Sequence, residues 1–281
     1  TVSRGIVAPE SVADPQIFVW AMMAALLAGA LWINLATWFG APVSTTHSIV
    51  GGVMGAGIAA AGFSAVNWAV MGKIAASWVI SPMLGGLIAA MFLAVVNNRI
   101  IYREDKIAAA RTWVPVMIGV MGGVFGTYMA MKGLKKIIHL SLGESMLIGL
   151  AIAVPLVLLM RPVIKRQSQG LENRAKSIKV LFSIPLVLSA TRELNRDDAN
   201  DVANAVGPLA AIVHAVQDGA SGDSVQIPYW VMIVGAVGLS FGLILFGPKL
   251  IKVVGSEITR LNAVRAWCVA LSAAVVVIIA S

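Results

Sequence analysis

Long apolar segments separated by short polar stretches constrain this chain more than any other feature. Each is close to or longer than the roughly 20 residues that a helix needs to cross a bilayer. They cover residues 17–39, 67–96, 113–131, 144–160, 227–246 and 263–280. Charged residues make up only 12% of the 281 residues, whereas soluble domains contain about a quarter. The sequence therefore predicts an all-α, polytopic transmembrane helix bundle surrounded by the lipid bilayer.

The formal net charge of +8 does not by itself indicate a nucleic-acid partner. Most lysine and arginine residues lie in the polar stretches between apolar segments, which is the pattern of loops on the cytoplasmic side. Residues 161–179 are the most polar of these stretches and are expected to form a cytoplasmic linker. We therefore expect no nucleic acid among the partners, and an internal boundary at this linker.

A run of hydroxyl side chains follows the first apolar segment, in residues 40–47 (Gly-Ala-Pro-Val-Ser-Thr-Thr-His). Pro42 is expected in the first turn of a new helix, where its missing N–H costs nothing. Ser44, Thr45 and Thr46 then place three hydroxyl groups beside the free N–H groups and the positive end of that helix, an arrangement that suits an anion. Ordinary capping, which needs only one hydroxyl, is the alternative explanation.

A second polar cluster lies in residues 199–208 (Ala-Asn-Asp-Val-Ala-Asn-Ala-Val-Gly-Pro). Asn200, Asp201 and Asn204 are spaced so that a helix gathers their polar ends on one side. Such groups are expensive inside a bilayer and mark ion or substrate sites.

Prolines inside the apolar segments predict discontinuous or re-entrant helices. Gly207-Pro208 is expected to end the helix that carries the second polar cluster, because proline has no N–H and clashes with the preceding turn. Ser81-Pro82 is expected to interrupt the segment 67–96 for the same reason. A polar cluster beside a helix break is a recurrent form of binding site in membrane transporters.

Together, the two motifs resemble those of the inorganic phosphate transporter family, the Pit-type phosphate permeases. The resemblance is carried by residues 40–51 (GAPVSTTHSIVG) and 199–212 (ANDVANAVGPLAAI). It implies secondary active transport of inorganic phosphate by alternating access, coupled to H⁺ or Na⁺, with no other cofactor and no enzymatic activity.

The family is built from two inverted repeats, and the resemblance implies a division of this chain. Residues 1–160 would be the latter part of the first repeat, residues 161–179 the cytoplasmic linker, and residues 180–281 the first part of the second repeat. The matching motif halves are expected before and after these residues, so the chain is expected to be the central part of a longer transporter.

Phosphate needs donors for its oxygens and an acceptor for its own hydroxyl group. Ser44, Thr45, Thr46, Asn200 and Asn204 are expected to donate to it. Asp201 is expected to accept its proton or, with Asn200 and Thr46, to hold the coupling cation, since hard oxygen ligands suit such ions. For His47, an orienting or proton-carrying role and a packing role both stay open.

Three rival functions remain. A permease for sulfate or another oxyanion is the nearest, although a carboxylate such as Asp201 would repel sulfate, which has no proton to offer it at pH 7. A non-transporting fragment or structural subunit is suggested by the charged residues 191–198, where the family has small and apolar residues. A membrane hydrolase using Ser44 and His47 lacks the glycine-bounded turn that presents a nucleophile.

The expected partners follow from the same resemblance. They are inorganic phosphate, either alone or as a metal–phosphate complex, the lipid bilayer, and a second copy of the chain in a homodimer. No metal site is expected in the protein itself. The bacterial inner membrane is the expected location.

Overall fold

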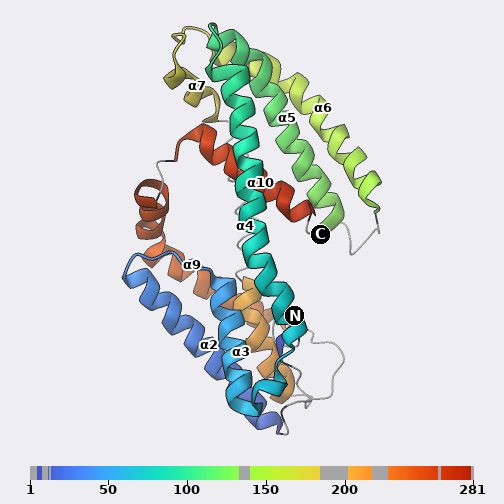
Figure 1. The fold of residues 1–281 in the computed structure, drawn as a ribbon, viewed down its shortest axis with the longest axis vertical. Helices are drawn as coiled ribbons and strands as arrows, with labels where there is room; N and C mark the ends of the chain where they lie inside the picture. Colours follow the sequence, from blue (N-terminus) through green and yellow to red (C-terminus); the bar gives the residue numbers. More distant parts are fainter. Residues whose placement is uncertain are drawn as a thin grey trace. The chain divides into compact units, whose positions relative to one another are not determined.

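The computed structural model describes residues 5–7, 12, 14–132, 140–183, 202–216, 227–258 and 261–279 (Figure 1). These residues form helices and an isolated bridge between Val7 and Val66. The α-helices are α2 (Pro15–Trp38), α3 (Thr45–Ala61), α4 (Trp68–Val96), α5 (Lys106–Lys132), α6 (Leu142–Gln167), α7 (Ala175–Leu181), the 202–216 helix (Val202–Val216), α9 (Tyr229–Lys252) and α10 (Ala263–Ile279). Short 3₁₀ and π turns are η2 (Phe63–Ala65), η3 (Asn97–Ile101) and η5 (Val253–Ile258). The all-α fold class is confirmed.

Five of the helical segments in the described residues are long and apolar enough to cross a bilayer. They are Pro15–Trp38, Trp68–Ile101, Lys106–Met131, Leu142–Gln167 and Tyr229–Glu257. Large apolar side chains are exposed along several of them, such as Leu147 and Leu158 on α6, which suits contact with lipid. The polytopic architecture is confirmed, and α3, the 202–216 helix and α10 are shorter than the roughly 20 residues of a typical crossing.

The expected interruption at Ser81-Pro82 is wrong, because α4 runs through Pro82 without a break. Proline removes one helical hydrogen bond, and membrane helices tolerate that loss when their surroundings and small local adjustments compensate for it. α5, α6 and α9 likewise contain internal prolines. In a chain of this kind, proline alone does not end a helix.

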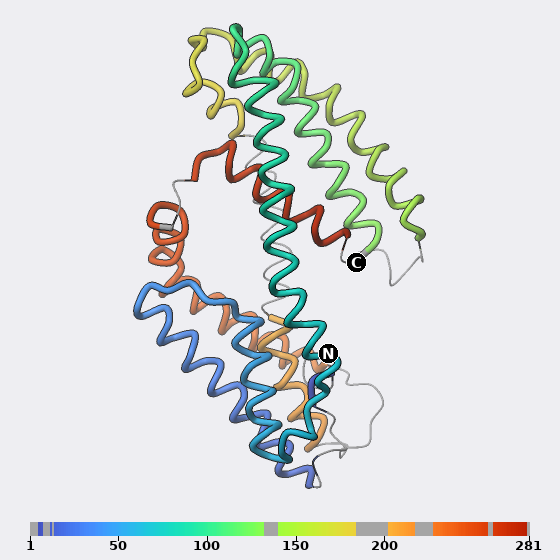
Figure 2. The backbone as a smooth tube through the Cα atoms, viewed as in Figure 1, coloured from blue at the N-terminus to red at the C-terminus, as the bar shows by residue number. Residues whose placement is uncertain are grey.

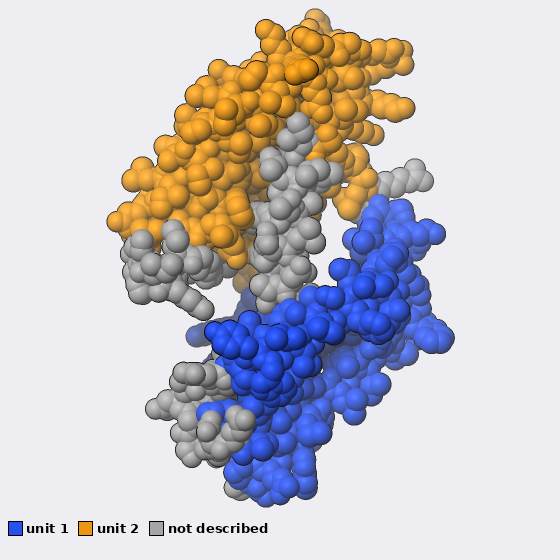
Figure 3. Space-filling model, turned by 180° about the vertical axis from the view of Figure 1, so that it is seen from behind, with its two compact units in different colours: residues 1–77, 196–260 blue, residues 78–195, 261–281 orange. Residues whose placement is uncertain are grey.

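The chain divides into two compact units, coloured separately in Figure 3. Unit 1 comprises residues 1–77 and 196–260, and unit 2 comprises residues 78–195 and 261–281. This is a division by contacts, so the repeat boundaries expected at residues 160 and 180 stay a prediction. Of the polar stretch 161–179, the first residues complete α6 and the last belong to α7.

Unit 2 is held together by close helix packing and an apolar core. α5 and α6 run side by side (Figure 1), and a Cβ atom added to Gly123 would lie 3.1 Å from the carbonyl oxygen of Gly149. Small residues allow such backbone contact within membranes. In the core, the ring of Trp267 meets Phe92 and Phe182 edge-on, with Ile100, Ile118 and other buried side chains around it.

Unit 1 brings together α2, α3, the 202–216 helix and α9. α2 and α3 lie side by side (Figure 2), and a Cβ atom on Gly52 would lie 2.7 Å from the carbonyl oxygen of Ala25. Gly235 of α9 faces Val206, whose Cγ2 atom would be 2.7 Å from a Cβ atom at that position. These contacts leave no room for larger residues and therefore fix the spacing of the helices around the site.

Candidate functional site

The hydroxyl motif lies at the junction between α2 and α3. α2 ends at Trp38, and Gly40 adopts a φ of +72°, the left-handed conformation in which helices commonly end at glycine. Its N–H donates to the carbonyl of Thr37 at 3.0 Å. The chain can therefore reverse direction within a few residues and begin α3 beside α2.

Ser44 is the N-cap of α3, so the capping alternative holds for this residue. Its Oγ accepts the backbone N–H of His47 at 3.3 Å. The expectation that Pro42 opens the helix is wrong, because α3 starts at Thr45 and Pro42 lies two residues before the cap. The physical reason is that a serine side chain can accept an N–H from the first turn, which a proline cannot do.

The hydroxyl motif (residues 40–47) and the carboxamide motif (residues 199–208) are joined by a hydrogen bond. Asn204 Nδ2 donates to Thr46 Oγ1 over 2.8 Å, although the two residues are 158 positions apart. Asn204 is only 5% exposed, and a buried amide needs such a partner because leaving it unpaired costs about 1–3 kcal/mol. This bond lies within unit 1 and ties the 202–216 helix to the start of α3.

The expected helix break at Gly207-Pro208 is wrong, since the helix is continuous from Val202 to Val216. The φ of proline fits an α-helix, and only the hydrogen bond to the residue four positions earlier is lost. That residue is Asn204. Its carbonyl therefore cannot receive the usual helical N–H, although the helix continues past this position.

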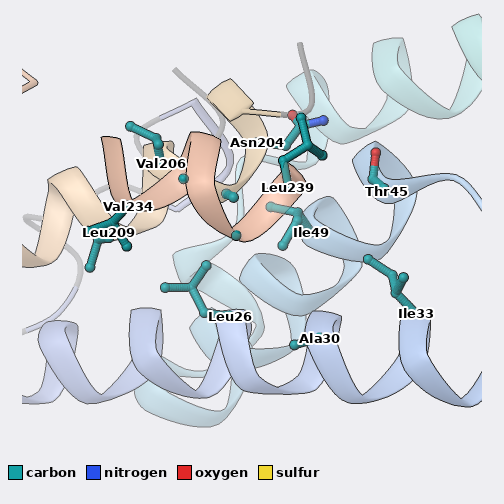
Figure 4. A pocket seen from close by; sticks show the side chains of 13 residues that line it. Leu26, Ala30, Ile33, Thr45, Ile49, Asn204, Val206, Leu209, Val234 and Leu239 are labelled. Atoms are coloured by element: carbon teal, nitrogen blue, oxygen red, sulfur yellow. The ribbon is translucent and has the colours of Figure 1, made fainter. Parts of the chain in front are cut away.

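A cavity of about 390 Å³ adjoins this contact. Thr45 and Asn204 supply polar groups to its wall. The other lining residues are apolar and come from α2 (Leu26, Ala30, Ile33), α3 (Ile49), the 202–216 helix (Ala205, Val206, Leu209) and α9 (Val234, Gly235, Gly238, Leu239). Figure 4 shows the polar ends of Thr45 and Asn204 on the side of the cavity away from Leu26 and Ala30. An apolar chamber thus has its polar groups gathered at one edge.

The remaining predicted site residues are placed as follows. Ser44 and His47 are exposed at the start of α3 and are not among the residues that line the cavity. Asn200 and Asp201, and the charged segment 191–198, lie outside the described residues. The binding roles expected for all of these residues, and for Thr45, Thr46 and Asn204, stay predictions.

Sequence reasoning missed Lys249, near the end of α9. Its Nζ donates to the carbonyl oxygen of Trp38 over 2.7 Å, at the C-terminal end of α2, where the helix dipole is negative. This contact holds α9 against the turn that leads into the hydroxyl motif. The available signal was a lysine in the last turn of an apolar helix, which does not reveal its distant partner.

The family model and the related proteins described here match the whole chain and have names that refer to phosphate transport. The family model described as "Phosphate transporter family" matches residues 1–281. A Helicobacter pylori J99 protein named "Putative phosphate permease" is 45% identical over 284 residues, covering 100% of this chain and 53% of that protein. Inorganic phosphate transporter 2-1 of Arabidopsis thaliana chloroplasts is 31% identical, with 100% of this chain and 52% of that protein covered.

A solved structure titled "The sodium-dependent phosphate transporter" has the same fold. It matches with a TM-score of 0.85 and 32% sequence identity, over 100% of this chain and 69% of that one. The chain thus spans about half the length of the Helicobacter relative. The hydrolase alternative is set aside by these matches, and from its helices, its motifs and its relatives the chain belongs to the phosphate transporter family.

Proposed function

We propose that the complete protein carries inorganic phosphate across the membrane together with a cation, by alternating access. The observation that supports this most is the bond between Asn204 and Thr46, which joins the two polar motifs beside a cavity. Family membership supports the substrate. Na⁺ is the first coupling ion to test, because the structural relative is titled sodium-dependent; H⁺ is the second.

The cavity wall explains why phosphate would need a cation. Its lining is mostly apolar, and an unpaired anion in such surroundings is strongly destabilised. Thr45 and the N–H groups at the start of α3 can replace part of the water around the phosphate oxygens. Asn204 carries two amide hydrogens, one of which bonds Thr46, so the other can serve the anion.

The remaining charge would be balanced at the carboxamide motif. Asp201 directly precedes the described start of the 202–216 helix, and we assign it the coupling cation or the phosphate proton. A cation held there, with oxygen ligands from Asn200 and Thr46, lowers the repulsion between the carboxylate and the anion. The two ions then stabilise each other's binding, and movement of the loaded site from one side to the other couples their fluxes.

Uptake of radiolabelled phosphate into proteoliposomes tests the proposal. The complete protein should concentrate phosphate when a Na⁺ or H⁺ gradient is imposed. Thr46→Val should reduce uptake by about tenfold or more, because the buried amide of Asn204 loses its hydrogen-bond partner and the coupling cation loses a proposed oxygen ligand. The matched control is Thr127→Val, which removes a buried hydroxyl bonded to the Gly123 carbonyl in unit 2. Equal uptake by the parent and Thr46→Val would contradict the proposed site.

The same assay distinguishes the finer alternatives. Unlabelled sulfate should compete poorly if Asp201 takes the phosphate proton, and effective competition would favour a general oxyanion permease. Removing divalent cations with EDTA separates free phosphate from a metal–phosphate complex as the transported species. The bacterial inner membrane as the location and a homodimer as the assembly stay predictions, to be tested by fractionation and by mass measurement in detergent.

A further inference from the structure

A separate, more polar pocket lies in unit 2, and none of its lining residues belongs to the proposed transport site. It has a volume of about 200 Å³ and is lined by residues at the end of α4 with η3, in α7 and at the start of α10. Its polar lining residues are Asn97, Lys179, Asn262 and Arg265. No acidic residue is among the described residues that line it. A pocket with two cationic side chains and two carboxamides in its wall suits an anion, because these groups donate hydrogen bonds.

The start of α10 strengthens this preference. Asn262 precedes the helix, and its Oδ1 accepts the backbone N–H of Arg265 at 3.0 Å. The first N–H groups of a 17-residue helix therefore lie at the pocket, where the helix dipole is positive. The carboxamide nitrogen of Asn262 offers two further N–H donors. The two cationic side chains, the free backbone N–H groups and the helix dipole therefore all favour an anion in this pocket.

The rest of the lining is apolar, which distinguishes this pocket from a site for a small ion alone. Leu93 lies one turn before Asn97 on α4, and Ile101 closes the candidate membrane span Trp68–Ile101. Val264 adds a third apolar wall on α10. The volume equals that of about seven water molecules in the liquid, enough for a phosphate group with part of the molecule to which it is attached. Polar and apolar groups together at the end of a span match an amphiphile at the membrane surface.

We propose that this pocket binds a phosphate group carried by an anionic phospholipid, with Lys179 and Arg265 contacting the phosphate and Leu93, Ile101 and Val264 contacting the apolar part of the lipid. Both cationic side chains are exposed, so they can reach a headgroup without a change in the core beneath them. Basic pockets between helices at the cytoplasmic ends of membrane spans bind anionic headgroups in this way. The proposal is independent of phosphate transport, since none of these residues belongs to unit 1.

Lipid binding to the complete purified protein tests the proposal. The thermal unfolding midpoint is followed in detergent while phosphatidylglycerol or phosphatidylcholine is added, and an apparent Kd is obtained for each. Phosphatidylglycerol should raise the midpoint, and phosphatidylcholine should not. The double variant Lys179→Gln/Arg265→Gln should weaken phosphatidylglycerol binding by about tenfold or more. Its control, Lys176→Gln/Arg166→Gln, removes the same charge from exposed residues that do not line the pocket.

A neutral substitution keeps the test independent of overall charge. Asn97→Ala removes a carboxamide from the pocket wall and should weaken phosphatidylglycerol binding severalfold, whereas Asn98→Ala, on the neighbouring exposed residue, should not. Inorganic phosphate is titrated separately in a Thr46→Val background, which weakens the transport site's contribution. Binding of inorganic phosphate that also depends on Lys179 and Arg265 would identify a free anion as the ligand source; a response to phosphatidylglycerol alone identifies the lipid. Unchanged affinity in the double variant, or an equal loss in its control, would overturn the proposal.

Discussion

Units 1 and 2 differ in what their interiors contain. In unit 2, apolar side chains fill the interior around Trp267 and Phe182, and the hydrogen bond between the side chains of Arg111 and Ser168 lies near helix ends. In unit 1, a buried carboxamide and a hydroxyl meet beside a largely apolar cavity. A filled core contributes stability, whereas a cavity with polar groups at one edge contributes binding. Substitutions in the unit 2 core should therefore mainly change stability, and substitutions beside the unit 1 cavity should mainly change phosphate handling.

The largest effect is expected at the centre of the unit 2 core. Trp267 is 1% exposed and touches two other rings, so Trp267→Ala should lower the free energy of unfolding by about 3–5 kcal/mol. Denaturant unfolding in mild detergent measures this change. Phosphate affinity per folded molecule should stay as in the parent protein, and a selective loss of affinity would show that the two units are not separable in this way.

In unit 1, Asn204→Leu should reduce phosphate uptake by about tenfold to a hundredfold, because the variant loses a buried donor at the proposed site and leaves Thr46 without this partner. Uptake in proteoliposomes, normalised to the folded protein in each preparation, measures the effect. A fall in uptake that merely follows a fall in folded protein would mean that Asn204 is structural.

Helix packing in unit 2 gives a sharper stability test. A Cβ atom at Gly149 would clash with the Thr127 hydroxyl and the Gly123 backbone, so Gly149→Ala should destabilise the protein by about 1–3 kcal/mol. The matched control is Gly143→Ala in the same helix, where a Cβ atom meets nothing within 4 Å. If the two variants have the same unfolding midpoint, α5 and α6 are not as close as described.

Two helix caps provide the most direct comparison between the units. Ser44 caps α3, and Ser141 caps α6 with a capping box that includes Glu144. Replacing either serine by alanine should cost about 1 kcal/mol of stability. Only Ser44→Ala should also raise the KM for phosphate, because only Ser44 caps the helix whose first N–H groups are proposed to bind the anion. Equal transport by the two variants would assign Ser44 to capping alone.

The smallest effect is expected at Lys249. Lys249→Gln removes the cation at the C-terminal end of α2 and should cost about 0.3–1 kcal/mol. Transport should slow by a small factor, because the turn before the hydroxyl motif is held less firmly. The unfolding midpoint is measured at low and high salt. It should fall with added salt more in the parent protein than in Lys249→Gln, because salt screens the attraction between the lysine and the helix dipole.

The sequence predicts the features of this structure that depend on neighbouring residues better than those that depend on residues far apart in the chain. The apolar segments 17–39 and 67–96 closely anticipate α2 and α4, because hydropathy over about 20 residues is a local property. Pro82 and Pro208 were misjudged because the rule that proline ends a helix comes from water, where freed carbonyl groups find solvent. In a bilayer a broken helix exposes more unpaired backbone than a continuous one.

The site itself was only partly predictable. Family resemblance indicated that the two motifs belong together. It did not indicate that Thr46 pairs with Asn204, because that pairing depends on how α3 and the 202–216 helix pack. The Lys249–Trp38 contact joins residues 211 positions apart and has no local signature. Asp201, the residue on which ion coupling is proposed to depend, lies outside the described residues, so its role rests on the resemblance and on chemistry.

A double-mutant cycle on Thr46 and Asn204 tests the central claim most directly, namely that the two motifs form one phosphate site. The kcat/KM for phosphate uptake is measured for the parent, Thr46→Val, Asn204→Leu and the double variant. We predict a coupling energy of about 1 kcal/mol or more, with the double variant little worse than the poorer single variant. Losses that add to within about 0.3 kcal/mol would contradict the account, because the two side chains would then act on transport independently.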